Sequence, residues 1–339
     1  MDLPRIRRTL DEQAGVISRH QVLLAGGSPA DIARLVRRRE WVRLLPGVLL
    51  DHTGEPTWLQ RAWAGVVFHS PAALGGRSAL RAALGPGWRH HRDDDPIEIA
   101  VPQRRHMDPQ PGYAISRRSD FAGRVQWNAS PPRIRIEHAG LDVAAAAESE
   151  FELIAVLADL CQTRRTTAPR LLGALAERGK VRHRAWLSGI LGDVAAGSCS
   201  VLEQGYLDRV ERAHGLPVGR RQTPVAVGGR GCRRDVEYDA IVVELDGRLF
   251  HDSAGARDVD LDRDLVTAVE GKDAVRLGWG QVFDRPCWTA RQVALLLHRR
   301  GWLGVPLPCH PGCDVASTGV GDAPGAPYAP VDRPGRWVV

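Results

Sequence analysis

Acidic residues in the second half of the chain have the types and spacing of a metal-binding site. Glu244 and Asp246 lie two apart after the apolar run 241–243, so in a strand both side chains point to one face of the sheet. A hairpin with the preceding predicted strand brings Asp235 beside Glu244, and Glu203 lies in the first turn of a predicted helix. Carboxylates that converge repel one another unless a cation or protons compensate. Oxygen ligands suit Mg²⁺ or Mn²⁺, which can activate water.

The elements that must position these acids follow one another in a recognisable order. Ser200 is the predicted N-cap of a helix over 201–214. Hydrophobic periodicity then predicts strands over 221–227, 232–238 and 241–247, a helix over 256–271, a strand over 274–278 and a helix over 289–300. The predicted order is α-β-β-β-α-β-α, with the acids at one edge of the sheet.

Most of these residues also have a simpler interpretation. A glutamate in a first helical turn, such as Glu203, favours the helix dipole without any metal. Asp235 can cap a turn or pair with Arg233 or Arg234, and His251 can be an exposed loop residue. As an imidazole that titrates near neutral pH, His251 also suits a general acid or base.

The stretch 200–297 resembles the PD-(D/E)XK nuclease superfamily, and within it the branch that holds the very-short-patch-repair (Vsr) endonucleases and their uncharacterised relatives. The resemblance rests on Ser-Val-Leu-Glu at 200–203, Arg-Asp-Val at 234–236 and Val-Glu-Leu-Asp-Gly at 243–247. It implies a restriction-endonuclease-like core and Mg²⁺-dependent phosphodiester hydrolysis, with Asp235 and Glu244 as metal ligands and Glu203 as the acid of the first helix. The superfamily's lysine is replaced by Asp246, which would be a further ligand, with His251 in the acid–base role.

The first 52 residues predict a winged helix-turn-helix. Helices are expected over 4–13, 19–24 and 28–39, followed by a hairpin over 41–50 around Pro46-Gly47. The third helix would present Arg34, Arg37 and Arg38 as a recognition helix, with Arg43 on the hairpin. The alternative is a solvated basic face on a small helical bundle.

This N-terminal segment is similar to the winged helix of AbiEi-type antitoxins of type IV toxin–antitoxin systems, which in actinobacterial proteins is often joined to a nuclease-like domain. The resemblance implies double-stranded DNA as a partner and a cognate toxin as a possible second one. It also implies a rival function, a non-enzymatic DNA-binding regulator in which the nuclease-like fold is catalytically silent.

Composition agrees with a multidomain, mixed α+β protein. The 339 residues are 43% hydrophobic and 25% charged, which is ordinary globular composition. No apolar run is long enough to span a bilayer, so we expect a cytoplasmic protein with reduced thiols and no membrane partner. The net charge is +6, and residues 1–50 hold nine arginines against five acids, which permits nucleic-acid binding. Phosphate-binding loops and nucleophile elbows are missing from the sequence.

Two further regions complete the expected organisation. Residues 53–195 predict a mixed α/β middle region before the nuclease-like domain, 196–303. Residues 304–339 are rich in Pro and Gly, which predicts a flexible tail. Within it, Cys309 and Cys313 flank His310, with Cys287 as the nearest other cysteine. These are zinc-ligand types, and the alternative is incidental thiols in a flexible tail.

Overall fold

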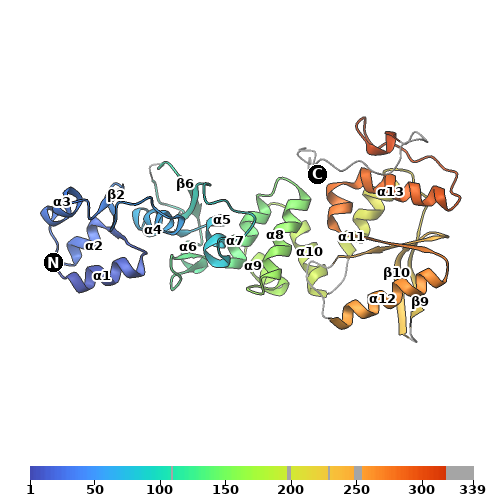
Figure 1. Cartoon of the computed structure of the whole chain (residues 1–339), viewed down its shortest axis with the longest axis horizontal. Helices are drawn as coiled ribbons and strands as arrows, with labels where there is room; N and C mark the ends of the chain where they lie inside the picture. Colours follow the sequence, from blue (N-terminus) through green and yellow to red (C-terminus); the bar gives the residue numbers. More distant parts are fainter. Residues whose placement is uncertain (108–109, 197–199, 228–229, 248–253, 318–339) are drawn as a thin grey trace. The chain divides into compact units, whose positions relative to one another are not determined.

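The computed structural model describes residues 1–107, 110–196, 200–227, 230–247 and 254–317. It confirms the mixed α/β class with several sheets. The chain divides into two compact units, Met1–Val143 and Ala144–Val339 (Figure 1). The boundary therefore falls inside the predicted middle region, 53–195. Among the helices of the described ranges, none is both long enough and apolar enough to cross a membrane.

The first unit begins with the arrangement of a winged helix. Its elements are α1 (Leu3–Glu12), β1 (Val16–Ser18), α2 (Arg19–Leu24), α3 (Pro29–Arg37), β2 (Val42–Leu45) and β3 (Val48–Leu50). The three strands form an antiparallel sheet in the order β1-β3-β2. The predicted helices and hairpin are all present. Strand β1 was not predicted, because three residues are too few to show a strand period.

Side-chain caps explain where two of these helices begin. Ser18 Oγ accepts from the backbone N–H of Gln21, and the Gln21 side chain accepts from the backbone N–H of Ser18 over 2.8 Å. Ser28 and Asp31 make the same reciprocal pair at the start of α3, with Pro29 in the first turn. These capping boxes satisfy N–H groups that have no partner within the helix.

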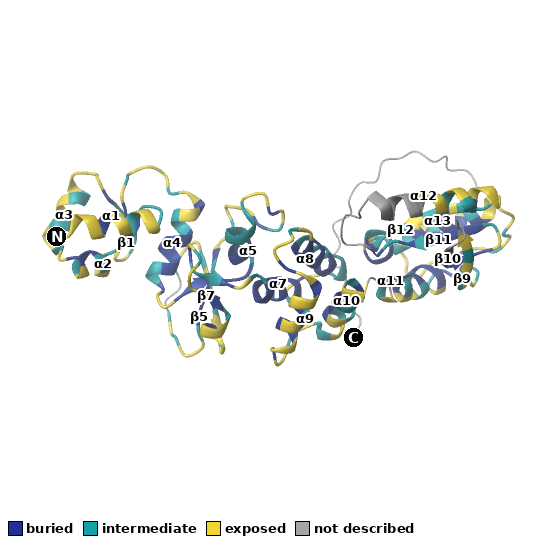
Figure 2. Ribbon diagram, turned by 90° about the horizontal axis from the view of Figure 1, so that it is seen from below, coloured by how far each residue is buried: buried dark blue, intermediate teal, exposed yellow. Residues whose placement is uncertain are grey.

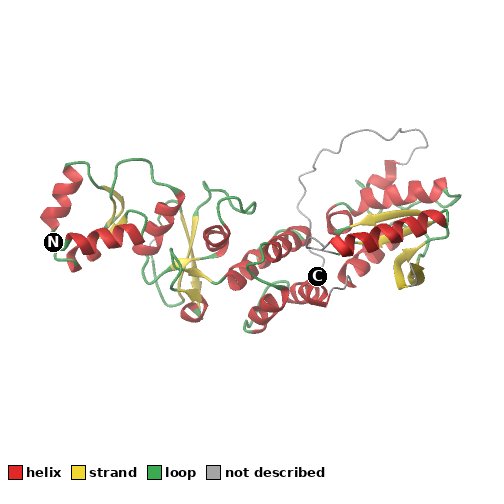
Figure 3. Ribbon diagram, turned by 60° about the horizontal axis from the view of Figure 1, so that its bottom comes forward, coloured by secondary structure: helices red, strands yellow, loops and turns green. Residues whose placement is uncertain are grey.

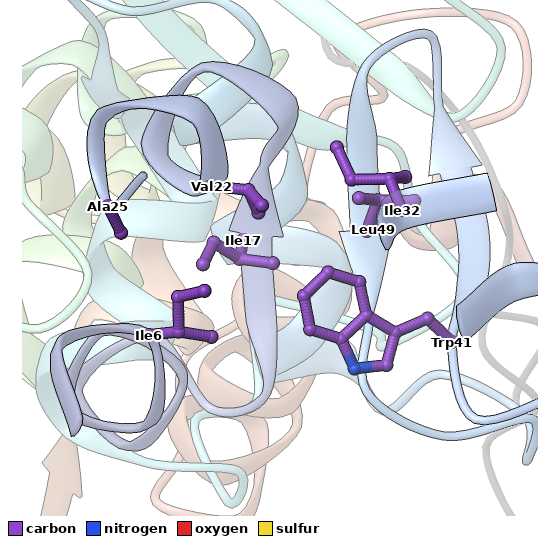
Figure 4. Packing of buried hydrophobic residues seen from close by; sticks show 7 residues of the cluster. All are labelled: Ile6, Ile17, Val22, Ala25, Ile32, Trp41 and Leu49. Atoms are coloured by element: carbon purple, nitrogen blue, oxygen red, sulfur yellow. The ribbon is translucent and has the colours of Figure 1, made fainter. Parts of the chain in front are cut away.

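A small hydrophobic core joins the helices to the sheet. Figure 4 shows its buried members, which come from the three helices, from the cap of α2, from β1 and β3, and from the residue before β2: Ile6, Ile17, Val22, Ala25, Ile32, Trp41 and Leu49. A second cluster joins Val16, Val48 and Leu50 to Trp63 and Ala64 of the next helix, α4 (Trp58–Phe68). The winged helix therefore shares a core with the segment that follows it.

The remainder of the first unit is a five-stranded mixed sheet, in the order β6-β5-β4-β8-β7, with helices around it. Strands β5 (Ile97–Pro102) and β6 (Tyr113–Arg118) pair in parallel, from Ile97–Tyr113 to Pro102–Arg118. The elements are β4 (Ala73–Leu74), α5 (Gly76–Leu84), β5 (Ile97–Pro102), β6 (Tyr113–Arg118), α6 (Phe121–Arg124), β7 (Val125–Gln126), β8 (Arg133–Ile134) and α7 (Ile136–Ala145).

The second unit contains three helices, α8 (Glu150–Gln162), α9 (Ala168–Ala176) and α10 (Arg184–Ala196), followed by the predicted α-β-β-β-α-β-α order. Figure 2 shows α8 with much of its surface buried, as its run of covered apolar residues requires. The later elements are α11 (Ser200–Gly205), the π-helical segment η1 (Tyr206–Arg212), β9 (Arg220–Val227), β10 (Arg230–Glu237), β11 (Ile241–Leu245), α12 (Ala254–Val269), β12 (Asp273–Leu277), the π-helical segment η2 (Gly280–Asp284) and α13 (Pro286–Arg299).

The sheet of the second unit has the order β12-β11-β10-β9. Strands β11 and β12 are parallel, and the other neighbours are antiparallel. Figures 1 and 3 show these strands between helices, with α12 on one side and α11 and α13 on the other. The predicted helix over 201–214 continues from α11 into the wider turns of η1. Gly205 lies at this junction and packs against the ring of Phe283, where a Cβ atom would collide with the ring.

The predicted flexible tail differs in part from the structure. Residues 304–317 are described, and Cys313 and Val315 are 3% and 1% exposed. The short 3-10 helix η3 (Asp314–Ser317) packs against α13. Burial of Cys313 and Val315 against the preceding helices explains why this segment has a defined place. The rest of the predicted tail, 318–339, lies outside the described residues.

Candidate functional site

Asp235 lies where two neighbouring strands separate. The backbone pairing of β10 with β11 includes Val236 with Val243 and does not extend to the next pair, Asp235 and Glu244. Instead, Oδ2 of Asp235 accepts a hydrogen bond of 2.7 Å from the backbone N–H of Leu245. The Asp235 side chain thus takes the place of a main-chain acceptor where β10 and β11 separate. We call this point, with Asp235 on β10 and Glu244 on β11, the fork. Continued by one pair, the register would set Asp235 opposite Glu244, and this is the pair at which the two strands separate.

Gln222 joins Asp235 to Glu203. Its Nε2 donates to Oε1 of Glu203 over 3.1 Å and to Oδ1 of Asp235 over 3.3 Å. The backbone of Gln222 has a φ of 50°, a left-handed conformation that non-glycine residues adopt infrequently and that occurs often at functional sites. The amide therefore holds two carboxylates from separate elements, α11 and β10, at one place.

Gln222 was not among the predicted site residues, although a signal for it exists in the sequence. Gln222 and Asp235 lie equally far from Gly228-Gly229, and residues at equal distances from a hairpin turn face each other. The pairs on either side follow this rule, since Thr223 pairs with Arg234 and Arg221 with Val236.

Electrostatics at this point favour an added positive charge. Burial raises the pKa of Glu203, and the neighbouring carboxylate of Asp235 raises it further. The hydrogen bond from Gln222 and the charge of Arg221 act in the opposite direction without cancelling the rise. A proton or a cation between Glu203 and Asp235 would relieve this repulsion.

A buried polar network anchors the strand that carries Gln222. Arg221 lies 2.8 Å from a carboxylate oxygen of Glu211, which is 1% exposed. The Tyr238 hydroxyl donates to the same oxygen over 2.9 Å and lies 2.9 Å from the Tyr206 hydroxyl. Burial raises the pKa of both tyrosines, so both phenols are neutral at physiological pH. This network holds Arg221, which precedes Gln222 in the chain, against Glu211 of η1.

Glu244 and Asp246 share a face of β11 and its extension, as predicted. Both are half-buried, and they alternate with buried Val243 and Leu245. On the neighbouring strand β12, the residue paired with Glu244 is Arg276, whose guanidinium lies 3.0 Å from Asp264. The sheet thus places a positive side chain next to Glu244 by register.

The predicted acids do not all converge. Within the described ranges, no three of these carboxylates lie close enough together to form a metal-binding group of that size. Glu203 and Asp235 are brought together by Gln222, Glu244 lies beside Asp235 in register, and Asp246 is two residues further along. The predicted acid–base residue His251 lies outside the described residues. A cation site here would therefore use two protein carboxylates, with water completing its coordination.

The two arginines next to Asp235 have other partners. Arg234 is 5% exposed and pairs with Glu237 over 3.0 Å and with Glu270 over 2.8 Å. Lys272 pairs with the same two glutamates. The remaining arginine, Arg233, donates to the backbone carbonyl of Gln222 over 3.1 Å. The structure therefore does not favour the alternative interpretation in which Asp235 pairs with Arg234.

The predicted DNA-binding arginines all lie on the surface of the winged helix. Arg34, Arg37 and Arg38 are exposed on α3, whose apolar face packs into the core, and Arg43 is exposed on β2. Arg34 pairs with Asp31 over 2.9 Å, and Arg38 lies 3.6 Å from Glu40. Such exposed pairs are weak and salt-sensitive, so they do not prevent these side chains from binding phosphate.

The cysteines singled out in the sequence also come together. The sulfur atoms of Cys287, Cys309 and Cys313 form one group with a ring nitrogen of His214, a residue that was not predicted as a ligand. His214 precedes the nearest of these cysteines by 73 positions, so local spacing contained no signal for it.

Comparison with known proteins leaves the function to be argued from these sites. No protein-family model matches the chain, and a search of curated proteins finds no match.

Proposed function

We propose that this chain is a DNA-associated protein of the cytoplasm that docks on duplex DNA through its winged helix and hydrolyses phosphodiester bonds at the fork of its second sheet. The resemblance of residues 200–297 to Vsr-like PD-(D/E)XK nucleases also supports this proposal. The observation that carries it is the meeting of Glu203 and Asp235 on Gln222, at the point where β10 and β11 separate, with the pKa of Glu203 raised.

The residues at the fork fit a hard divalent cation. Asp235 and Glu244 would hold Mg²⁺ or Mn²⁺, with Asp246 acting through a water molecule bound to the ion. Such an ion supplies Lewis-acid activation of water and stabilisation of charge at the scissile phosphate. Gln222 orients Asp235, and Glu203 holds or accepts a proton near it. We also propose His251 as a general acid or base, by its place in the family motif.

A positive charge normally accompanies the acids of this superfamily, and here the lysine position is Asp246. Arg276 is paired with Glu244 on the next strand, so it supplies a positive charge near the fork. A guanidinium stays protonated, so it can neutralise charge but cannot accept a proton. This arrangement supports hydrolysis in which the proton transfer uses Glu203 or His251.

Cleavage is tested on supercoiled plasmid with Mg²⁺ or Mn²⁺. We expect nicking that falls about 10²-fold or more in Asp235→Asn and Glu244→Gln, because the cation loses a charged ligand. Asp208→Asn is the matched control, since Asp208 is exposed on η1 and pairs with Arg212. Nicking that persists in both site variants, or that the wild type never shows, contradicts the hydrolytic proposal.

The docking face is tested separately by duplex binding. Arg37→Gln and Arg43→Gln each remove an exposed charge, so affinity should fall and the slope of log affinity against log salt should decrease by about 0.9 for each lost phosphate contact. Arg92→Gln is the matched control, because Arg92 is an exposed arginine of the same unit outside the winged helix. If all three variants reduced the affinity for DNA equally, the effect would come from the lost net charge, and this would contradict docking through the winged helix.

A second function, a silent DNA-binding regulator resembling an AbiEi-type antitoxin, is favoured by one observation. Both carboxylate oxygens of Asp235 already accept hydrogen bonds, from Gln222 and from Leu245, and Asp246 replaces the motif lysine. The regulator would bind duplex DNA with the same arginines and show no metal-dependent cutting. Its partner would then be a cognate toxin.

A further inference from the structure

Four metal-ligand side chains from separate segments meet in the second unit, apart from the acids of the fork. His214 follows η1, Cys287 lies in the first turn of α13, and Cys309 and Cys313 precede η3. One ligand atom from each residue lies within 4.8 Å of all the others. Among the described residues, no other group of three or more possible metal ligands is compact enough to hold one ion.

The spacing of the sulfur atoms is that of a tetrahedral thiolate site. Sγ of Cys287 lies 3.5 Å from Sγ of Cys309, which lies 3.8 Å from Sγ of Cys313. Ligand bonds of about 2.3 Å in a tetrahedron place sulfur atoms about 3.8 Å apart. A disulfide requires about 2.05 Å, and the cysteines are free thiols. A single disulfide joins only two cysteines, so it would leave the third thiol of this group unpaired.

His214 has one ring nitrogen in the form that a metal ligand requires. The side chain is fully buried, at 0% exposure. Nδ1 lies 3.0 Å from the carbonyl oxygen of Val210, and because a carbonyl can only accept, Nδ1 carries the proton. Nε2 then has its lone pair available and makes no hydrogen bond of its own. Metal-ligating histidines characteristically have this arrangement, in which a backbone carbonyl orients the ring.

A nearby histidine is less suited to the role. Nε2 of His310 lies 3.5 Å from Sγ of Cys287, but the side chain is exposed. Its Nδ1 accepts from the backbone N–H of Gly312 over 3.2 Å, which leaves the proton of the neutral ring on Nε2. A protonated nitrogen cannot ligate a metal.

We propose that His214, Cys287, Cys309 and Cys313 bind one structural Zn²⁺ ion. Thiolate and imidazole ligands select zinc over Mg²⁺ or Ca²⁺, and four protein ligands leave no open position for catalysis. On binding, the three thiols lose their protons to solvent and the imidazole stays neutral, so the oxidation states are unchanged. This inference is independent of the proposed nuclease function.

The ion would fasten the segment after α13 to the rest of the unit. Leu303 and Val305 are 95% and 75% exposed, so this segment buries little apolar surface before Cys313. One backbone hydrogen bond, from the N–H of Leu307 to the carbonyl of His214, links it to the end of η1. A metal cross-link would stabilise the stretch between α13 and Cys313, where apolar burial contributes little, in addition to the burial of Cys313 and Val315.

The first test is the zinc content of the full-length protein, purified without chelators and measured by mass spectrometry of the metal. We expect one zinc per chain in the wild type. His214→Ala and Cys313→Ser should each lose it, whereas Cys232→Ser and His310→Ala should retain it. Cys232 is a matched control because it is a half-buried cysteine of β10 outside the group. Wild-type protein without zinc that also fails to bind added Zn²⁺ would overturn the proposal.

A second measurement avoids dependence on the folding of the variants. Replacing zinc by Co²⁺ in the wild type should give the visible absorption of tetrahedral cobalt together with thiolate-to-cobalt charge transfer, and added Zn²⁺ should displace both. An octahedral cobalt spectrum without charge transfer would show that the thiols do not ligate and would contradict the assignment. Loss of nuclease activity alone has no bearing on either result.

Discussion

At the scale of single residues, the main electrostatic feature of the fork is the repulsion between the carboxylates of Glu203 and Asp235. Gln222 donates one amide group to both carboxylates, which orders them without neutralising them. Their repulsion and the burial of Glu203 raise its pKa. A glutamate with a raised pKa destabilises the folded protein at neutral pH, where it is ionised.

The raised pKa predicts how Glu203→Gln changes stability with pH. A group with a raised folded-state pKa stabilises the fold while it is protonated, and that contribution disappears as pH rises through the folded pKa. Glutamine removes the ionised form, so the variant should have a Tm a few degrees above wild type at pH 7 and close to wild type at pH 4. Thermal unfolding at both pH values, without divalent ions, measures this difference.

Glu270→Gln gives the opposite sign and serves as the control. Hydrogen bonding and charge from Arg234 lower the pKa of Glu270, so its ionised form stabilises the fold above its unfolded pKa. This variant should lose stability at pH 7. A Glu203→Gln protein that is also less stable at pH 7 would show that Glu203 has a structural role.

At the scale of elements, α3, the helix proposed to dock on DNA, depends on its cap. Ser28→Ala removes the side chain that accepts from the backbone N–H of Asp31 and donates to its carboxylate. We expect a loss of about 1 kcal/mol in the free energy of unfolding of the first unit, measured with urea. Duplex affinity at 25 °C should change little, because the exposed arginines remain.

Ser18→Ala at the start of α2 is the matched cap control, since Ser18 and Gln21 form the same capping box. It should cost a similar amount of stability, also without a change in salt dependence of DNA binding. If Ser28→Ala reduces affinity far more than Ser18→Ala does at equal stability, then Ser28 or Asp31 contacts DNA directly.

At the scale of the whole molecule, the chain consists of two compact units, each with its own core. We expect residues 1–145, which retain all of α7, to fold cooperatively alone and to bind duplex DNA with the salt dependence of the full chain. Calorimetry of the full chain should show two transitions. A zinc chelator should lower the Tm of the second unit and leave the first unchanged. A fragment that remains unfolded would contradict the independence of the units.

Local signals in the sequence were enough to predict most elements of the winged helix and of the region from α11 to α13. Ser18, Ser28 and Pro29 define helix starts because a cap acts within four residues, and the α-β-β-β-α-β-α order follows from short-range periodicity. The acids at 235, 244 and 246 were likewise predicted, since strand alternation is a local property. Strand β1 was not predicted, because three residues are too few to show a strand period. The break between α11 and η1 was not predicted either, because it depends on the packing of Gly205 against the distant Phe283.

Only the tertiary structure decided which side chains meet. Gln222 joins Glu203 to Asp235 because a hairpin register and a helix end bring three separate segments together. His214 reaches Cys287, Cys309 and Cys313 because the segment after α13 returns to the end of η1. Contacts of this kind depend on loop closure and packing over tens of residues, and no local pattern of residue types specifies them.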